Sequence, residues 1–425
     1  MGNGHSISIR DCLDAWAKPF NLEFPVIPAA VVRPQNVIEV SETVNNYGLG
    51  GEHGAVSIDL VNLKDFEMDN ETWYASFGAG TNLGELDKNL HTFGRRAIAH
   101  GTCPSGGLGP ISRMWGGALD HVVEMEVVTA DGTIYLASQN RTPDLFWAMR
   151  GAGASFGIVT RFVAKTRPEP GNIVQYSYSL TLNSQTETAD LYKEWQALVG
   201  DPTMDRRFAS LFVVQPLGAL ITGTFFGSEA EYQASGIPAR LPGASKGAVW
   251  LTNWMGHLLH EAEAAGCTLA SIPTAFYSKS LSLNEQDLLN DTAITNLFQY
   301  LEDSRSKSTP FTIIFNTEGG AMMDTPVNAT AYPHRDSVIM YQSYGIGVGK
   351  VSAATRKLLD GIHEQIQRSA PGARSTYAGY VDAWLDRKAA QELYWADNLQ
   401  RLQEIKKRWD PDQVFRNPQS VEPAD

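Results

Sequence analysis

The sequence predicts an α+β protein built from two unlike parts and a helical tail. Between about residues 25 and 170, short β-type segments are separated by tight glycine turns. From about 171 to 375, longer apolar strands are interspersed with helices, the pattern of an antiparallel sheet covered by helices. The 425 residues, 43% of them hydrophobic and 19% charged, can bury a large core in more than one domain. We expect domains at 1–170, 171–375 and 376–425.

In the first part, a hairpin and a helix are the clearest elements. AVSIDLVNL at 55–63 alternates like a half-buried strand, and EMEVVTADGTIYLAS at 124–138 reads as two strands joined by an Asp-Gly turn. PDLFWAMRG at 143–151 predicts a helix that leads through GAGASFG into the strand GIVTRFVAK at 157–165. The order is helix, glycine loop, strand. A dinucleotide fingerprint of the Rossmann type needs the order strand, loop, helix, so NAD binding is not predicted.

The second part and the tail also contain clear predicted strands and helices. A helix with apolar spacing is predicted over 387–409, ended by Asp410-Pro411, and NPQS follows at 417–420 as a short closing segment. The expected strands of the second part are IVQYSYSLTL, FASLFVVQ, LITGTFFG, FTIIFN and VIMYQSYG, and its expected helices are TADLYKEWQALVG and VSAATRKLLDGIHEQIQRSA. These segments would form the domain that holds a substrate.

Composition and charge exclude several classes of function. The net charge of −13, without a lysine or arginine run, gives no footprint for nucleic acid or for an anionic membrane. The start lacks the apolar run of a secretory signal, and no window is long enough to span a bilayer, so we expect a cytoplasmic protein. Gly2 and Ser6 fit the myristoylation pattern, but so short a match is read as chance. We expect a monomer that acts on a small molecule.

The cysteines and histidines predict no metal site. Cys12, Cys103 and Cys267 are too few and too scattered for a disulfide framework, and no spacing is that of a zinc site. Structural roles are expected for His53, His100, His121 and His334.

Two stretches contain candidate functional residues. Cys103 lies in GTCPSGGLG, a turn in which a thiol can be reactive or carry a covalent attachment, although an isolated cysteine is more often a small buried residue. Gly106 and Gly107 would let the backbone approach a ligand, including phosphate oxygens. Tyr377 and Tyr380 lie in STYAGYVDAWLD. A buried tyrosine with a lowered pKa can be a general base, but spacing alone favours packing roles for both.

Long stretches of the chain together resemble one protein family. The segments that show this are AHGTCP, GGLGPISRMWGGALDHVVEMEVVTADG, DLFWAMRGAGASFGIVT, TAYPHRD, TYAGYVD and YWADNLQRLQEIKKRWDPDQVFRNPQS. With these segments, the sequence resembles the berberine bridge enzyme-like, or PCMH-type, FAD-linked oxidoreductases of fungi, in particular the branch of glucooligosaccharide and chitooligosaccharide oxidases. The resemblance implies a two-part FAD-binding domain, a substrate domain whose antiparallel sheet roofs the flavin, and a tail that returns to the flavin domain.

The resemblance also implies roles for individual residues. Cys103 matches the cysteine that can bond covalently to the flavin, and Tyr380 matches the tyrosine that takes the substrate hydroxyl proton while hydride passes to flavin N5. Oxygen would then reoxidise the flavin and yield hydrogen peroxide. The other positions expected at the cofactor are Gly106, Gly107, Asp120, Val128, Gly157, Ile158, Val159, Asn398 and Gln419. Strand alternation, rather than the resemblance, places Asn316, Glu318 and Gln342 where they would face the substrate, an oligosaccharide or a fungal secondary metabolite, and Tyr377 is a further candidate.

The chain departs from the family pattern in its N-terminal half. A strand with an Arg-Ser-Gly-Gly-His-Ser turn is missing before NYGLGG, a phosphate-binding segment is missing between Ser105 and Gly106, and the stretch after Leu13 is short. Such turns pair the charge of the flavin phosphates, so their loss should weaken FAD binding. An internally shortened oxidase and a degenerate paralogue are both consistent with these gaps. The alternative function is a flavin-free binding protein, pseudoenzyme or cyclase-like catalyst.

Overall fold

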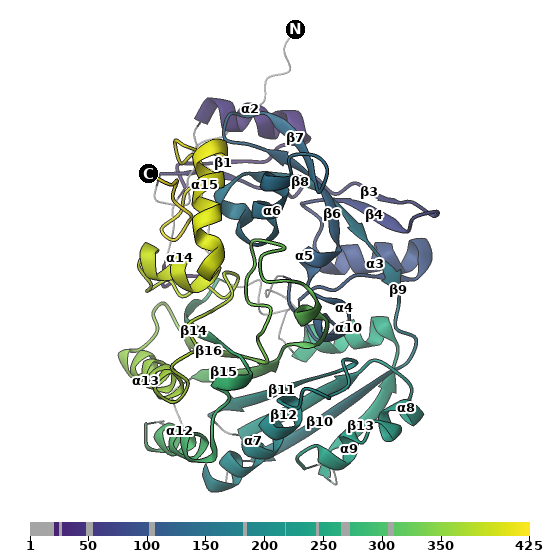
Figure 1. Ribbon diagram of the computed structural model, residues 1–425, viewed down its shortest axis with the longest axis vertical. Helices are drawn as coiled ribbons and strands as arrows, with labels where there is room; N and C mark the ends of the chain where they lie inside the picture. The colour runs from purple at the N-terminus through teal and green to yellow at the C-terminus, as the bar shows by residue number, and fades with distance from the viewer. Residues whose placement is uncertain are drawn as a thin grey trace.

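Two antiparallel sheets form the framework of the protein. The computed structural model describes residues 21–24, 28–47, 54–101, 107–181, 185–216, 218–243, 246–264, 273–304 and 310–425. A five-stranded sheet with the order β3-β4-β8-β6-β7 lies in the upper half of Figure 1. A seven-stranded sheet with the order β13-β10-β12-β11-β15-β16-β14 lies in the lower half. Helices pack against both sheets, which confirms the predicted α+β class.

The five-stranded sheet is formed by residues from the first part of the chain. Its β6–β7 hairpin turns at Asp131-Gly132, as the sequence predicts: Gly132 has a φ of 75°, and Asp131 Oδ1 accepts from the Thr133 amide at 3.0 Å. Helix α6 (Pro143–Ala152) packs on this sheet, and the short helix η1 (Gly153–Ser155) leads into β8. The strands are β3 (Phe66–Met68), β4 (Tyr74–Gly78), β6 (Val122–Val128), β7 (Ile134–Ser138) and β8 (Ile158–Lys165).

Smaller elements surround this sheet. The segment 55–63 was predicted to be one strand, but only β2 (Val56–Ile58) forms, paired in parallel with β1 (Ala30–Val32). The strand ends because Asp59 turns to Arg33, with an N–O distance of 2.7 Å between their side chains. The remaining elements are α2 (Val37–Tyr47), α3 (Leu83–Gly94), β5 (Arg96–Ala97), α4 (Ser112–Trp115), α5 (Ala118–His121) and β9 (Arg167–Pro168).

The seven-stranded sheet has one face covered by helices. Helices α7 (Gln185–Val199), α12 (Asp291–Ser304) and α13 (Ala353–Ser369) share a hydrophobic core with it (Figure 1). Helix α10 (Trp254–Ala264) lies on the other face, where His257 Nδ1 and Gln175 Nε2 are 3.0 Å apart. The strands are β10 (Ile173–Thr181), β11 (Phe208–Gln215), β12 (Gly218–Phe225), β13 (Ala248–Thr252), β14 (Ala275–Leu283), β15 (Phe311–Thr317) and β16 (Ile339–Gly347). The short helices are α8 (Glu229–Ala234), α9 (Ile237–Arg240), η3 (Glu285–Asp287) and η4 (Gly320–Asp324).

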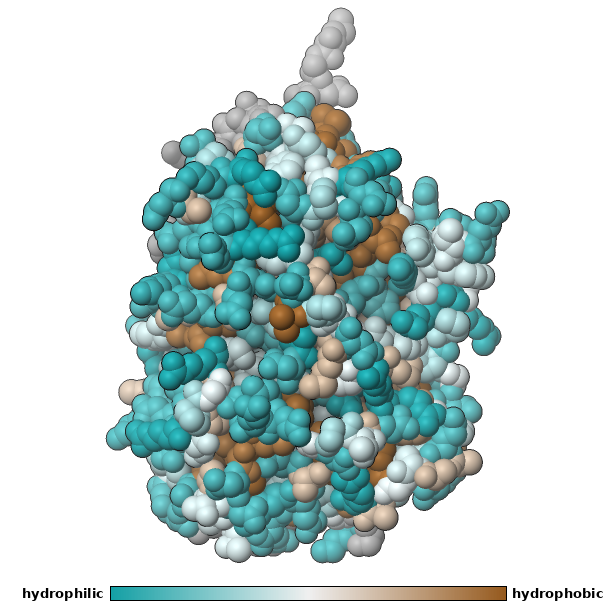
Figure 2. Space-filling model, in the orientation of Figure 1, coloured by the Kyte–Doolittle hydropathy of each residue, from teal (hydrophilic) through white to brown (hydrophobic). Residues whose placement is uncertain are grey.

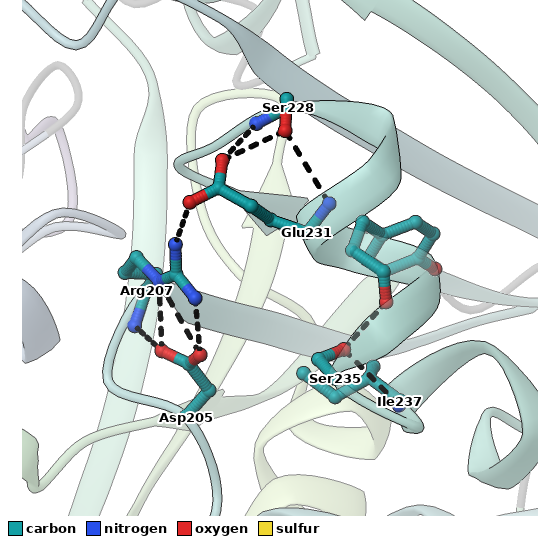
Figure 3. A network of polar contacts seen from close by, with 7 residues as sticks. Asp205, Arg207, Ser228, Glu231, Ser235 and Ile237 are labelled. Atoms are coloured by element: carbon teal, nitrogen blue, oxygen red, sulfur yellow. Dashed lines mark hydrogen bonds and ion pairs between the residues drawn. The ribbon is translucent and has the colours of Figure 1, made fainter.

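A surface ion-pair network fixes the entry into β11 (Figure 3). Arg207 donates to Asp205 at 2.8 Å and to Glu231 at 2.7 Å. Glu231 also accepts from the amide of Ser228, which caps α8. This hydrogen bond is the largest cause that lowers the Glu231 pKa to about 2. The network therefore ties α8 to the start of the strand.

The predicted single tail helix is broken into two helices. Helix α14 (Arg387–Trp395) and helix α15 (Leu399–Trp409) are separated by η5 (Ala396–Asn398), and Ala396 has a φ of 43°. The break is stabilised because Asn398 Nδ2 donates to the carbonyls of Val327 and Thr330, at 2.8 and 3.1 Å. In Figure 1, α15 lies beside α6, and the two helices are in contact.

The molecular surface is mixed in character. Figure 2 shows a face dominated by hydrophilic residues, with small separate hydrophobic patches. Among the residues that the structure describes, no helix is both long enough and apolar enough to cross a bilayer.

Candidate active site

A cavity of about 500 Å³ lies between the five-stranded sheet, the tail and the segment that carries the two predicted tyrosines. Four parts of the chain that are distant in sequence form its wall. They are Gly107 with the start of α5, the run 149–155 at the end of α6, the segment 377–381, and the tail residues 417, 419 and 420. The cavity therefore exists only when the tail has packed onto the first part of the chain.

Glycine is required at one point of this wall. Gly151 has a φ of 137°, which side-chain-bearing residues rarely adopt. A Cβ added there would lie 2.3 Å from the backbone nitrogen of Tyr332. At Gly107, an added Cβ would lie 3.3 Å from the Cβ of Ala118. At these two glycines the wall is backbone, and a flat ligand can approach it closely.

The lining fits the isoalloxazine part of FAD. Apolar side chains of Met125, Met149 and Phe162 can pack on an aromatic ring system, and the volume is within the range of cofactor sites, about 300–1,000 Å³. Arg150 also lines the cavity, and its buried Nε has no hydrogen-bond partner among the described residues. Residues 48–53, which follow the place where the family has a phosphate-binding turn, and residues 102–106 lie outside the described residues.

The structure places only some of the expected cofactor residues at this cavity. Cys103 and Gly106 lie outside the described residues, as do Cys12 and Cys267. Gly107 and Gln419 line the cavity. Gln419 is held rigidly, because Nε2 donates to the Asp382 carbonyl at 2.7 Å and Oε1 accepts from the Tyr394 hydroxyl at 2.9 Å.

Asp120 lies behind the cavity wall. It makes a two-point ion pair with Arg335, at 2.7 and 2.9 Å, and accepts from the Gly117 amide at 2.9 Å. The Arg335 side chain is only 2% exposed. This pair therefore joins α5, from the first part, to the loop between β15 and β16.

The remaining expected cofactor residues do not line the cavity. Val128 and Ile158 pair in the sheet and pack in a hydrophobic cluster near α2, and Val159 packs against the cluster under α6. Gly157 permits close packing, since an added Cβ would lie 2.7 Å from Val127 Cγ1. The Asn398 amide is occupied by the loop carbonyls described above.

Three tyrosines form a buried cluster beside the cavity. Tyr377 lines the cavity and accepts from the Gly107 amide at 3.3 Å. Its ring meets those of Tyr332 and Tyr380, with centroid distances of 5.8 and 5.1 Å. Burial, reinforced by nearby tyrosines and Glu318, raises the Tyr380 pKa well above its ordinary value. The Tyr332 hydroxyl is buried and has no hydrogen-bond partner among the described residues.

The predicted substrate residues lie next to this cluster, on the seven-stranded sheet. Gln342 is hydrogen-bonded to Tyr380 and accepts from the Tyr344 hydroxyl at 2.8 Å. Asn316 Nδ2 donates to Glu318 Oε1 at 2.9 Å. Burial raises the pKa of Glu318 to about 8, so its carboxyl group is mostly protonated at neutral pH. The structure therefore brings Asn316, Glu318, Gln342 and Tyr380 together.

Arg113 was not predicted as a functional residue, but it locks this region in place. It donates through Nε to the Phe208 carbonyl at 2.8 Å and through Nη1 to the Glu318 carbonyl. Burial lowers its pKa to about 10. Arg113 comes from α4, so the first part of the chain directly contacts the ends of β11 and β15.

Arg150 and the wall residues 151–155 were also missed by the sequence analysis. The glycine run at 151–157 does not match a nucleotide fingerprint, and of its residues only Gly157 was expected at the cofactor, from the family motif that contains the run. The signal for the wall is Gly151 in the last turn of α6, where its positive φ lets backbone border a ligand.

Two family models match parts of the chain that form this cavity. The family model described as a FAD binding domain matches residues 40–138, and the model described as berberine and berberine-like matches residues 376–422. The FAD-linked oxidoreductase sorD of Penicillium rubens is 33% identical over 95% of this chain and 92% of its own. The xylooligosaccharide oxidase of Thermothelomyces thermophilus is 30% identical over 96% and 90%.

Solved structures agree with this assignment. A chitooligosaccharide oxidase superposes with a TM-score of 0.87 at 27% identity, covering 96% of this chain and 95% of its own. The glucooligosaccharide oxidase of Acremonium strictum gives a TM-score of 0.86 at 27% identity, covering 97% and 95%. Fold and site thus define a FAD-linked oxidoreductase. The chain belongs to the berberine bridge enzyme-like family, which confirms the resemblance, the PCMH-type fold and FAD as the cofactor.

Proposed function

We propose that the Tyr380 hydroxyl takes the substrate's hydroxyl proton in the FAD-linked oxidation of an alcohol or hemiacetal carbon. The observation that carries this role is the position of Tyr380. It contacts Tyr377, which lines the cavity, and it is hydrogen-bonded to Gln342 on the substrate sheet. A substrate hydroxyl near Tyr380 would therefore lie between the cofactor cavity and the sheet.

The chain's own residues would orient the substrate and remove one proton. FAD, when bound, supplies the redox chemistry by taking a hydride from the substrate carbon. The amide groups of Gln342 and Asn316 would bind the oxygen that becomes a carbonyl. The O–H proton moves to Tyr380 Oη, so the substrate loses one hydride and one proton in total.

The electrostatics of Tyr380 determine the expected pH dependence. Because burial raises its pKa, the phenol keeps its proton at neutral pH. Only the phenolate can accept the substrate's proton. At pH values below the pKa, the phenolate fraction increases tenfold for each unit by which the pH rises. The oxidation rate should therefore rise with pH across the neutral and mildly alkaline range.

Further parts of the proposal come from the sequence and the relatives. Oxygen is the proposed electron acceptor, giving hydrogen peroxide, because relatives named as oxidases align with almost the whole chain. We assign residues 1–170 to the FAD-binding domain, 171–375 to the substrate domain and 376–425 to the returning segment. A cytoplasmic monomer is the proposed state.

An absorption spectrum tests the cofactor part first. Protein purified or refolded with FAD should show flavin bands that alcohol bleaches under anaerobic conditions. If Cys103 carries the flavin, the bands should stay with acid-precipitated protein and leave it in Cys103→Ala. Protein without flavin bands under any condition would instead support the flavin-free alternative.

A further inference from the structure

One face of the seven-stranded sheet is partly open on the side of the tyrosine cluster. Along β15, buried and half-buried residues alternate strictly. The buried residues Ile313 and Phe315 belong to the core shared with α7, α12 and α13. Ile314 and Asn316 are half-buried and therefore point to the opposite face. The register of the sheet then identifies the side chains beside them.

A single row of side chains crosses this face. Gln342 lies opposite Ile314, Ile314 opposite Val213, and Val213 opposite Leu220. Directly paired residues of antiparallel strands point to the same face, so these four form one line across β16, β15, β11 and β12. With a strand spacing of about 4.8 Å, the row is about 15 Å long. We call these four residues the aliphatic row, since Gln342 at its start is followed by three aliphatic side chains.

The face is uncharged but not wholly apolar. Leu211 lies between Asn316 and Thr222 on one side of the row, and Thr312 lies opposite Tyr344 on the other. On this face of β11, β12, β15 and β16, the described residues include no charged side chain and no tryptophan. Polar side chains therefore flank the row on both sides, while the row itself is aliphatic beyond its glutamine.

We infer that the aliphatic row holds the hydrocarbon tail of the substrate, so that the chain oxidises an apolar alcohol of the secondary-metabolite type. The alcohol carbon would lie at Gln342 and Tyr380, and the tail would extend over Ile314, Val213 and Leu220. This inference rests on the proposed function, because that function places the reacting carbon beside Tyr380.

An oligosaccharide fits this face poorly. Sugar rings along the row would bring hydroxyl groups over three aliphatic side chains that offer no hydrogen bond. Hydroxyl groups directly over these side chains would lose their hydrogen bonds to water, because the flanking polar side chains lie two residues, about 7 Å, further along the strands. A hydrocarbon tail has no such groups, and its burial releases water from Ile314 and Leu220, which are only half-buried without a ligand.

Binding and flavin reduction can be measured with defined probes. FAD-loaded full-length protein is titrated with farnesol or oct-2-en-1-ol, and separately with cellobiose, xylobiose or chitobiose. The readouts are the shift in melting temperature and the anaerobic loss of flavin absorbance. We expect the apolar alcohols to raise the melting temperature and bleach the flavin, and the disaccharides to do neither.

A matched pair of variants tests whether farnesol binds at the aliphatic row. Leu220→Asn should raise the dissociation constant for farnesol by about 10-fold, because it replaces an apolar contact with a polar group. Val249→Asn is the control: Val249 is 47% exposed, and its partner Tyr176 belongs to the core of the opposite face. The melting temperature without ligand checks that each variant is folded, and Ile314→Asn serves as a second variant of the row.

The outcomes separate this inference from the proposed function. Bleaching by a disaccharide but not by an apolar alcohol would overturn the inference and leave the proposed function standing. Farnesol affinity equal in wild type, Leu220→Asn and Ile314→Asn would also overturn it. If the protein binds no flavin, the proposed function fails, and the farnesol-induced melting shift still decides whether the row binds an apolar chain.

Discussion

Tyr377 and Tyr380 meet edge to face, with ring centroids 5.1 Å apart and ring planes at 88°. A turn holds them in this arrangement, because the Tyr380 amide donates to the Tyr377 carbonyl at 2.8 Å. The turn directs Tyr377 to the cavity and Tyr380 to Gln342 on the sheet. One short segment thus links the cavity to the side chains of the sheet that we propose to hold the substrate.

Tyr380→Phe should slow substrate oxidation by about 10²-fold or more, because the proposed proton acceptor is removed while the ring packing remains. The measurement is the rate of anaerobic flavin reduction in stopped flow. Tyr332→Phe is the control, since Tyr332 belongs to the same cluster and its hydroxyl has no hydrogen-bond partner among the described residues. Equal rates in wild type and Tyr380→Phe, with the flavin content unchanged, would remove Tyr380 from the mechanism.

Glu318→Gln should change how stability depends on pH. The folded-state pKa of Glu318 is raised to about 8 from 4.5, so between these values the folded protein keeps a proton that the unfolded chain releases. Wild-type stability should therefore fall as pH rises through this window. Near pH 4.5 the two proteins should be similarly stable, whereas at pH 7.5 the variant should be more stable by roughly 3 kcal/mol.

Urea unfolding of both proteins at several pH values provides this measurement. A difference that stays constant from pH 4.5 to pH 7.5 would show that the Glu318 carboxyl group titrates normally in the folded protein.

Gly151→Ala should abolish or strongly weaken FAD binding. The new Cβ would lie 2.3 Å from the Tyr332 backbone nitrogen, in a backbone conformation with a φ of 137°, so the cavity wall must shift. Gly153→Ala is the matched control, because its Cβ would meet only the flexible end of Met149, at 3.3 Å. Flavin fluorescence titration compares the two affinities. Equal affinities would mean that the cavity beside Gly151 does not hold the flavin.

Asp120→Asn should destabilise the protein by about 3 kcal/mol or more, because it leaves the buried Arg335 guanidinium without its counter-charge. Asp324→Asn breaks an exposed ion pair with Arg206 and should cost about 1 kcal/mol or less. Chemical denaturation compares the free energies of unfolding. Similar losses in both variants would show that the Asp120–Arg335 pair does not hold the two parts of the chain together.

Local sequence signals predicted most regular elements but not their limits. The turn at Asp131-Gly132 and the helix starting at Pro143 appear as expected, since both depend on a few adjacent residues. The tail helix was predicted to be continuous because its apolar spacing continues through Asn398. Its break depends on carbonyls of the loop at 327–330, a long-range contact that periodicity does not contain.

In the candidate site, too, the sequence predicted some of the residues and not others. Family motifs indicated Tyr377, Tyr380 and Gln419, which lie at the cavity or beside it. The motifs also indicated Val128 and Asp120, which do not line this cavity, and their contact with the cofactor stays a prediction. The aliphatic row was not predicted, because its members come from four strands and only the sheet register aligns them.

The cavity wall combines residues 107–155 with residues 377–420, and this has a consequence for biosynthesis. While the ribosome is still translating the tail, the first part of the chain has emerged but cannot enclose a ligand. The wall can therefore close around a cofactor only after translation is complete, when the tail packs onto the first part.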